Sequence, residues 1–423
     1  MNRVNISEVQ IANKNFLKII LKWGVLSIIV GVLTGSVSAL FLVSLNWVTD
    51  YRELHSWIIW LLPLCGLGIG FCYHYYGKDI VKGNNLIIEE FLNPQKKIHI
   101  KMTPMIFIAT IATHLFGGSA GREGTAVQMG GSIADQFTNI FKLNNQERKI
   151  LLIIGISAGF ASIFSTPYAG AVFALEVLLV GRFGFQAILP SVLTALIADY
   201  TCTWWNVMHT KYEIPSIPNF QFNFIWWAII VGIVCGLTAL LFSKSVYFFE
   251  NQFKEKINSP VLRPVIGGAI IALAVYLMHT TKYIGLGIPT IQESFISELP
   301  PYDFLLKIAF TAYTLGAGFK GGEATPLFFI GATLGNALSF FIPLPIALLA
   351  GMGFVAVFAG STNTPIACTI MGIELFGLDC GIFVGIACLV AYFFSGPKGI
   401  YTSQPQTGIK YFLYKKIFKE RSS

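Results

Sequence analysis

Apolar residues run through this chain in long stretches that contain no charged side chain. Most of these stretches approach or exceed the roughly 20 residues with which an α-helix crosses a bilayer. They are Trp23–Val48, Trp57–Gly77, Met102–Gly121, Ile150–Leu175, Ile214–Ser243 and Val265–Thr281. A further stretch, Ala324–Ile373, is uncharged over 50 residues, and its glycines and prolines divide it into at least two helices. The pattern predicts an all-α polytopic membrane protein.

The composition supports this class. Of 423 residues, 54% are hydrophobic and 12% are charged, which is about half the charged share of an average soluble domain. The net charge of +8 comes from basic residues at helix ends and at the termini. Because Lys and Arg favour the cytoplasmic side, we expect a multi-pass protein of the cytoplasmic (inner) membrane with both termini in the cytoplasm. We do not interpret this charge as a nucleic-acid site.

Cysteine and histidine give no sign of a metal or a cofactor. The seven cysteines lie in apolar segments without paired ligand spacing, and the six histidines are scattered. We interpret the cysteines as small packing residues and expect no cofactor and no metal. An intramembrane enzyme would need a nucleophile and base, or metal ligands, at membrane depth. No such cluster is visible, so we do not expect an enzyme.

The chain repeats itself in three blocks that occur in the same order. GFASIFSTPYAGAVFALE, from Gly159, matches VFAGSTNTPIACTIMGIE, from Val357, at an offset of 198. The Glu and Thr of REGT match those of GEAT at an offset of 200, and KGNNLIIEEF matches LGIPTIQESF at an offset of 204. Three blocks in register indicate two homologous halves. The expected divisions are a cytoplasmic segment 1–20, a first membrane repeat 20–205, a linker 206–220, a second repeat 220–415 and a cytoplasmic tail 416–423.

The stretch GGSAGREGTAVQMGG (117–131) places Arg122 and Glu123 among six glycines inside an apolar region. Broken helices at matching places in two repeats indicate a transport site near the membrane midplane. Helix N-termini there would direct amide groups at an anion, and glycine lets the backbone approach the ion. A fixed carboxylate at this depth is costly, so we expect Glu123 to move or to take up a proton.

These motifs resemble the CLC anion channels and anion/proton antiporters. GREGT resembles the family's G-[RK]-E-G-P signature, and GLGIP (285–289), GGEATPLFFIGATLG (321–335) and GIYTSQ (399–404) resemble further signatures. The resemblance implies a fold of two inverted repeats with broken and tilted helices, and a homodimer with one anion pathway per subunit. It implies that Glu123 is the gating glutamate, that Tyr401 coordinates the anion and that the amides around Ala324 and Thr325 complete the site. Because the chain ends soon after Tyr401, the paired nucleotide-binding (CBS) domains of many eukaryotic members are not expected.

Three departures from the usual pattern narrow the resemblance. Thr125 replaces the Pro of the gating motif, and VKGNN (81–85) replaces G-S-G-I-P. The Ser that usually faces the anion corresponds to Lys82 by the repeat register, or to Asn84 after a shift of two, on either side of Gly83. Glu323 stands where chloride-type members carry an apolar residue. Together these features resemble the fluoride-specific branch, which exports fluoride in exchange for protons.

The resemblance does not assign a residue to the inner proton-transfer step. Val177 stands where chloride/proton antiporters carry an internal relay glutamate, and Glu176 matches a neighbouring acid that is not the relay. Without the relay, the protein is either a passive channel or a transporter that moves protons another way, for which Glu323 is the candidate. The alternative function is a chloride channel or a chloride/proton antiporter. Glu176 and Glu374 are expected at helix ends at the polar interface.

Overall fold

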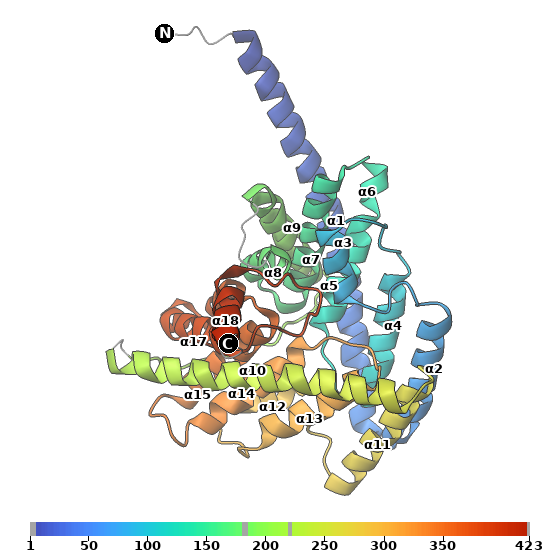
Figure 1. Ribbon diagram of the computed structural model, residues 1–423, viewed down its shortest axis with the longest axis vertical. Helices are drawn as coiled ribbons and strands as arrows, with labels where there is room; N and C mark the ends of the chain where they lie inside the picture. Colours follow the sequence, from blue (N-terminus) through green and yellow to red (C-terminus); the bar gives the residue numbers. More distant parts are fainter. Residues whose placement is uncertain (1–5, 180–184, 219–221, 421–423) are drawn as a thin grey trace.

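The computed structural model describes residues 6–179, 185–218 and 222–420, and its regular elements within these ranges are helices (Figure 1). In chain order they are α1 (Ile6–Leu54), η1 (Ser56–Leu61), α2 (Leu62–Tyr75), α3 (Asn84–Leu92), α4 (Met102–Leu115), α5 (Glu123–Asp135), α6 (Phe137–Ile140), α7 (Asn145–Phe164), α8 (Pro167–Leu179), α9 (Phe185–Trp204), α10 (Phe222–Lys256), α11 (Leu262–Met278), α12 (Ile288–Glu293), α13 (Asp303–Gly316), α14 (Ala324–Leu338), α15 (Ile346–Thr362), α16 (Pro365–Phe376), η2 (Leu378–Cys380), α17 (Gly381–Phe394) and α18 (Gly408–Glu420).

The expected membrane helices are present, and several are short. Four helical segments in the described residues are long and apolar enough to cross a bilayer: Lys18–Leu54, Ser56–Tyr75, Gln186–Trp204 and Phe224–Lys256. The first belongs to α1, which is continuous across residue 20 and extends beyond the other helices, whereas α10 crosses the molecule at a steep angle to it (Figure 1). The uncharged stretch 324–373 forms three helices, α14 to α16.

The two halves are built alike, as the repeats predict. Ser165 caps the end of α7 and Asn363 caps the end of α15, both in the left-handed conformation with φ of 57° and 60°. Two residues later Pro167 starts α8 and Pro365 starts α16, since proline is well tolerated in the first turn of a helix. Each half thus contains two helices joined by the same abrupt break, and the break lies at the same place in the repeat.

Glycine contacts hold the corresponding helix pairs together. A Cβ atom on Gly130 of α5 would lie 2.1 Å from the carbonyl oxygen of Gly155 of α7. In the second half, a Cβ atom on Gly331 of α14 would lie 2.1 Å from the carbonyl oxygen of Gly353 of α15. Only glycine permits these backbones to touch, as is common where membrane helices pack closely. The fold of two structural repeats with broken helices is therefore confirmed.

Two glutamates connect the halves. Glu374 of α16 accepts hydrogen bonds from the amides of Tyr168 (3.1 Å) and Ala169 (2.8 Å) at the start of α8. Glu176 of α8 accepts equivalent bonds from Ile366 (3.1 Å) and Ala367 (2.7 Å) at the start of α16. The sequence places both acids at helix ends in a polar interface. The structure adds that each carboxylate caps the first turn of a helix in the other half, where it also favours the helix dipole.

A buried ionic cluster holds α3, α5 and α7 together. The Arg148 guanidinium on α7 binds Asp135 at the end of α5 (2.7 Å) and Glu90 of α3 (3.0 Å), and all three residues are buried. Breaking such a cluster by removing one member is costly, because the others stay buried without a partner. Arg148 therefore keeps α3 and α5 in a fixed relation.

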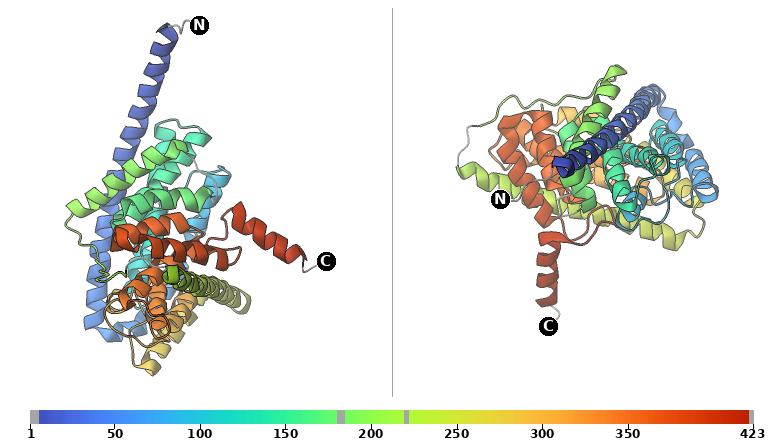
Figure 2. Two further views of the ribbon diagram at one scale, coloured as in Figure 1. Left: turned by 90° about the vertical axis from the view of Figure 1, so that its left-hand side faces the viewer. Right: turned by 90° about the horizontal axis from the view of Figure 1, so that it is seen from above.

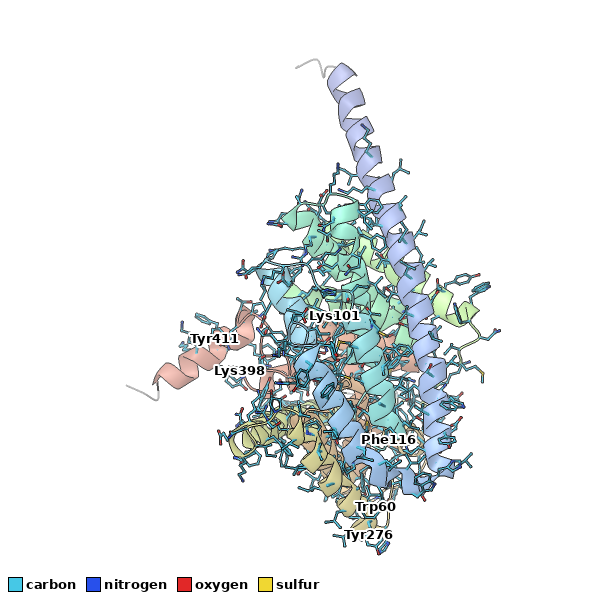
Figure 3. All side chains as sticks on the ribbon, turned by 90° about the vertical axis from the view of Figure 1, so that its right-hand side faces the viewer. Trp60, Lys101, Phe116, Tyr276, Lys398 and Tyr411 are labelled. Atoms are coloured by element: carbon cyan, nitrogen blue, oxygen red, sulfur yellow. The ribbon has the colours of Figure 1, made fainter. Side chains whose placement is uncertain are left out.

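The ends of the molecule differ in character. Trp60 and Tyr276 lie together at the end away from the N-terminus of α1 (Figure 3), with ring centroids 5.6 Å apart. Exposed aromatic rings of this kind are typical of a membrane–water interface. The basic helix α18 projects away from the body of the protein (Figure 2).

Candidate anion site

Two glycine-rich turns, one from each half, meet at the start of α5 and α14. The Gly121 amide donates to the Gly322 carbonyl (2.5 Å), and the Gly322 amide donates to the Gly121 carbonyl (2.7 Å). A Cβ atom on Gly322 would lie 2.6 Å from the amide nitrogen of Gly124, so this close pairing requires glycine. The turns thereby bring together the N-terminal ends of two helices, which favour negative charge.

The carboxylate of Glu123 occupies the N-terminus of α14. It is buried and accepts a hydrogen bond from the Thr325 amide at 2.9 Å. The Thr325 hydroxyl lies 2.6 Å from both of its oxygens. A side-chain carboxylate of the first half therefore uses the donors at which a free anion would bind in the second half.

The neighbours of Glu123 orient it. The Arg122 Nε lies 3.4 Å from one carboxylate oxygen, and Arg122 is partly buried. Thr125, which replaces the expected Pro, forms a hydrogen bond of 2.8 Å with Thr110 of α4. This contact joins α5 to α4 two residues after Glu123. Glu123 also lines a small cavity of 10 Å³, together with Phe164, His209, Tyr212 and other residues.

Asn84 and Lys82 lie in different surroundings. Gly83 has a φ of 57° and precedes the first residue of α3. A Cβ atom on Gly124 would lie 3.1 Å from the Asn84 Nδ2 and 3.5 Å from the Glu323 Oε2, so this amide and this carboxylate face the same spot. The Asn84 Oδ1 is buried and has no hydrogen-bond partner among the residues that the structure describes. Lys82 is exposed and forms an ion pair of 2.7 Å with Glu89.

Glu323 and Tyr401 complete the group. Glu323 is the residue before Ala324, the first residue of α14, and its carboxylate forms no ion pair with any described residue. Tyr401 is buried and interacts electrostatically with both Glu323 and Glu123. The Tyr247 hydroxyl on α10 donates to the carbonyls of Gly399 (2.7 Å) and Ile400 (3.0 Å), which holds the segment that carries Tyr401.

The usual position of the internal relay is apolar. Val177 is buried on α8, and its carbonyl accepts a hydrogen bond of 3.2 Å from the Gln404 side chain. Gln404 also donates to the Thr362 carbonyl at 2.8 Å. No carboxylate occupies this position, so an internal proton-transfer step would need a different proton-carrying residue.

The structure thus brings most of the expected site residues together. Glu123, Thr325 and Ala324 meet at the start of α14, and Glu323, Asn84 and Tyr401 surround the same region, whereas Lys82 points to a surface ion pair. Sequence reasoning missed Tyr247, which gives no signal in the sequence. A search of the described residues finds no cluster of His, Cys, Asp and Glu that could hold a metal ion.

Residues 65–396 match the family model described as voltage gated chloride channel. The chain is 49% identical over 396 residues to a protein named Chloride/fluoride channel protein from Pseudomonas syringae pv. tomato, covering 92% of this chain and 88% of that protein. It is 25% identical over 390 residues to the H(+)/Cl(-) exchange transporter ClcA of Yersinia pestis, covering 83% and 79%. A solved structure described as a CLC-type fluoride/proton antiporter matches with a TM-score of 0.88 at 36% identity, covering 91% of this chain and 98% of that chain.

Proposed function

Because the chain belongs to the voltage-gated chloride channel (CLC) family, we propose that it exports fluoride across the cytoplasmic membrane in exchange for protons. It is then a secondary active transporter rather than an enzyme. The similarity to a chloride/fluoride channel protein and to a fluoride/proton antiporter supports this choice. The alternative is a chloride channel or chloride/proton antiporter, which the more distant ClcA similarity represents.

The observation that carries the proposal is the position of the Glu123 carboxylate on the Thr325 amide and hydroxyl. An anion that binds to these donors must displace the carboxylate. Protonation removes the negative charge of Glu123 and weakens its hold on the donors, because charge-assisted hydrogen bonds are the stronger ones. Proton uptake by Glu123 and anion binding at α14 are therefore coupled.

The donors around this point suit fluoride. Fluoride is small and holds its water tightly, so a site must replace that water with several strong donors. Thr325 offers an amide and a hydroxyl, and the Tyr401 hydroxyl and the Asn84 amide are further donors. We propose that Asn84, rather than Lys82, faces the anion, because the Asn84 amide lies beside Gly124 and Glu323 while Lys82 pairs with Glu89.

The proposed inner proton carrier is Glu323. Val177 leaves the usual relay position without an acid, whereas Glu323 stands beside the anion donors and forms no ion pair within the described part of the chain. A buried carboxylate in this setting can bind a proton and release it, because burial penalises its charged form. Proton transfer between Glu123 and Glu323 would then pass across the anion site itself.

We also propose a homodimer with one complete pathway in each subunit, which is the assembly that the resemblance to the CLC family implies. The orientation with both termini in the cytoplasm rests on the positive-inside rule. The membrane repeats are proposed to span 20–205 and 220–415, joined by 206–220. Cross-linking of the protein in its native membrane tests the dimer, and accessibility of tags at both termini tests the orientation.

The function is tested in liposomes that hold the purified protein. A pH gradient should drive fluoride movement against its own gradient, and a fluoride gradient should drive protons. Glu123→Gln should abolish this coupling, whereas the exposed Glu298→Gln, as the matched control, should leave it intact. Proton movement by Glu123→Gln equal to that of the wild type would show that the gate is assigned to the wrong residue.

A further inference from the structure

Two cavities meet at Tyr212 in the linker before α10. The basic end of α10, with Lys254 and Lys256, belongs to the cytoplasm by the positive-inside rule, so this linker lies on the outer side. An outer cavity of 520 Å³ is lined by part of the linker, by the end of α12 with the residues after it, and by the start of α15. The inner cavity is the one of 10 Å³ that Glu123 lines. Tyr212 lines both cavities and therefore forms part of the wall between them.

His209 lines the inner cavity from the same linker. Its Nδ1 lies 3.1 Å from the carbonyl oxygen of Ile163 in the last turn of α7. A carbonyl oxygen can only accept, so Nδ1 carries the proton and Nε2 is the bare nitrogen of the neutral ring. This Nε2 is buried and has no hydrogen-bond partner among the residues that the structure describes. A cavity of 10 Å³ has room for about one water, and a water there would supply the missing partner.

The other residues that line the inner cavity, within the described ranges, do not both take up and release protons near neutral pH. Besides His209 and Glu123, the lining residues that can ionise are Arg122 and Tyr212. The Arg122 guanidinium keeps its proton, and burial raises the pKa of Tyr212 to about 12, so its phenol keeps its proton too. Burial and the Arg122 cation lower the pKa of His209, so its ring is neutral and can accept a proton.

We propose that His209 carries protons from the outer solution to Glu123. Its Nε2 takes a proton from water that enters from the outer cavity past Tyr212. The imidazolium then gives a proton to a carboxylate oxygen of Glu123 through water in the inner cavity. One proton thus moves from the outer solution to Glu123, and the ring returns to its neutral form with Nδ1 still bound to Ile163. The inference rests on the proposed function, because fluoride export in exchange for protons requires proton uptake from outside.

A structural role for His209 is the competing explanation, and one substitution separates the two roles. The last carbonyls of a helix lack partners within it, so the bond to Ile163 alone would favour a side chain with an N–H group. The side-chain amide of Asn offers an N–H group at about the position of Nδ1, but it does not titrate. His209→Asn therefore keeps the means to bind Ile163 and removes the proton carrier.

The test measures fluoride–proton exchange in liposomes that are strongly buffered at the same pH on both sides, over a range from mildly acidic to mildly alkaline pH. His209→Asn is compared with the wild type and with His279→Asn. His279 is the matched control because it is an exposed histidine at the end of α11 that lines neither cavity. Each protein is also measured with increasing concentrations of imidazole, a small base that can replace the missing ring.

His209→Asn should slow the exchange at least about tenfold at neutral pH, because a positioned proton-transfer group commonly contributes more than this to a rate. The loss should shrink at acidic pH, where water supplies protons to Glu123 more readily. Imidazole should restore the rate of His209→Asn and leave the wild type and His279→Asn unchanged. The fluoride affinity of His209→Asn in calorimetry should equal that of the wild type, because the donors at the start of α14 are intact.

An exchange rate of His209→Asn equal to that of the wild type would overturn the inference. A slow variant that imidazole does not restore would overturn it as well, because that result indicates a structural role. If His209→Asn does not fold, His209→Gln, which also lacks a titratable group, is measured in the same way with the same expected result. If the wild type exchanges no fluoride for protons, the proposed function fails, whereas wild-type exchange with an equally fast His209→Asn refutes this inference alone.

Discussion

The substitution Thr325→Val tests whether the Glu123 carboxylate and fluoride compete for the same hydrogen-bond donors at the start of α14. The substitution keeps the volume and the branched shape of the side chain and removes only the hydroxyl. That hydroxyl lies 2.6 Å from both oxygens of the Glu123 carboxylate, while the Thr325 amide remains as a donor at 2.9 Å. The change therefore removes one charge-assisted hydrogen bond from whichever anion occupies the start of α14.

The loss of fluoride affinity that Thr325→Val causes depends on whether the Glu123 carboxylate is present. A hydrogen bond to a charged group contributes about 1.5–3 kcal/mol, which corresponds to about a 10- to 150-fold change in a dissociation constant. In a Glu123→Ala background, fluoride competes only with water, so Thr325→Val should weaken fluoride binding by this full factor. In the wild-type background the carboxylate loses the same bond, and the two losses largely cancel in the apparent affinity.

Isothermal titration calorimetry of fluoride with the purified protein measures all four variants of this cycle. The expected result is a large loss from Thr325→Val without Glu123 and a small loss with it. Equal losses in both backgrounds would mean that Glu123 and the anion do not share this donor. No loss in the Glu123→Ala background would remove the Thr325 hydroxyl from the anion site.

Three further predictions test other parts of the account. Glu323→Gln should slow or uncouple fluoride–proton exchange in liposomes while chromatography still shows the wild-type oligomer; unchanged coupling would reduce Glu323 to a helix-dipole residue. Arg148→Met should lower the free energy of unfolding by about 3–5 kcal/mol, because it leaves buried carboxylates unpaired, whereas Lys22→Met at a more exposed pair should cost about 0–1 kcal/mol; comparable losses in denaturant titrations would argue against the buried cluster. Asn84→Ala should weaken fluoride binding in calorimetry and Lys82→Ala should not, and the reverse result would restore the register in which Lys82 faces the anion.

The two-repeat fold could be predicted from the sequence because the repeated blocks match at nearly constant offsets. The matched offsets around Pro167 and Pro365 predict two similar breaks, and the structure has a left-handed residue two positions before each proline. The glycines around Glu123 predict a backbone that can approach an ion, which stays a prediction; the structure adds that Gly121 pairs with Gly322 across the two halves. The transport roles of Glu123 and Glu323 stay predictions.

Other features depend on contacts that no local pattern encodes. Whether Lys82 or Asn84 faces the site depends on how α3 lies against α5, and a buried arginine on α7 fixes that relation. The capping of α8 by Glu374 joins residues more than two hundred positions apart in the chain. Long-range packing of this kind is invisible to repeat and motif analysis.

The most direct test of the central claim is the ratio of fluoride to chloride flux from the same liposomes, recorded with the two ion-selective electrodes side by side. The account predicts that the purified protein moves fluoride at least about tenfold faster than chloride, a discrimination of about 1.4 kcal/mol, and that cells lacking the protein become sensitive to fluoride. Comparable rates for the two ions would contradict the fluoride assignment and favour the chloride alternative.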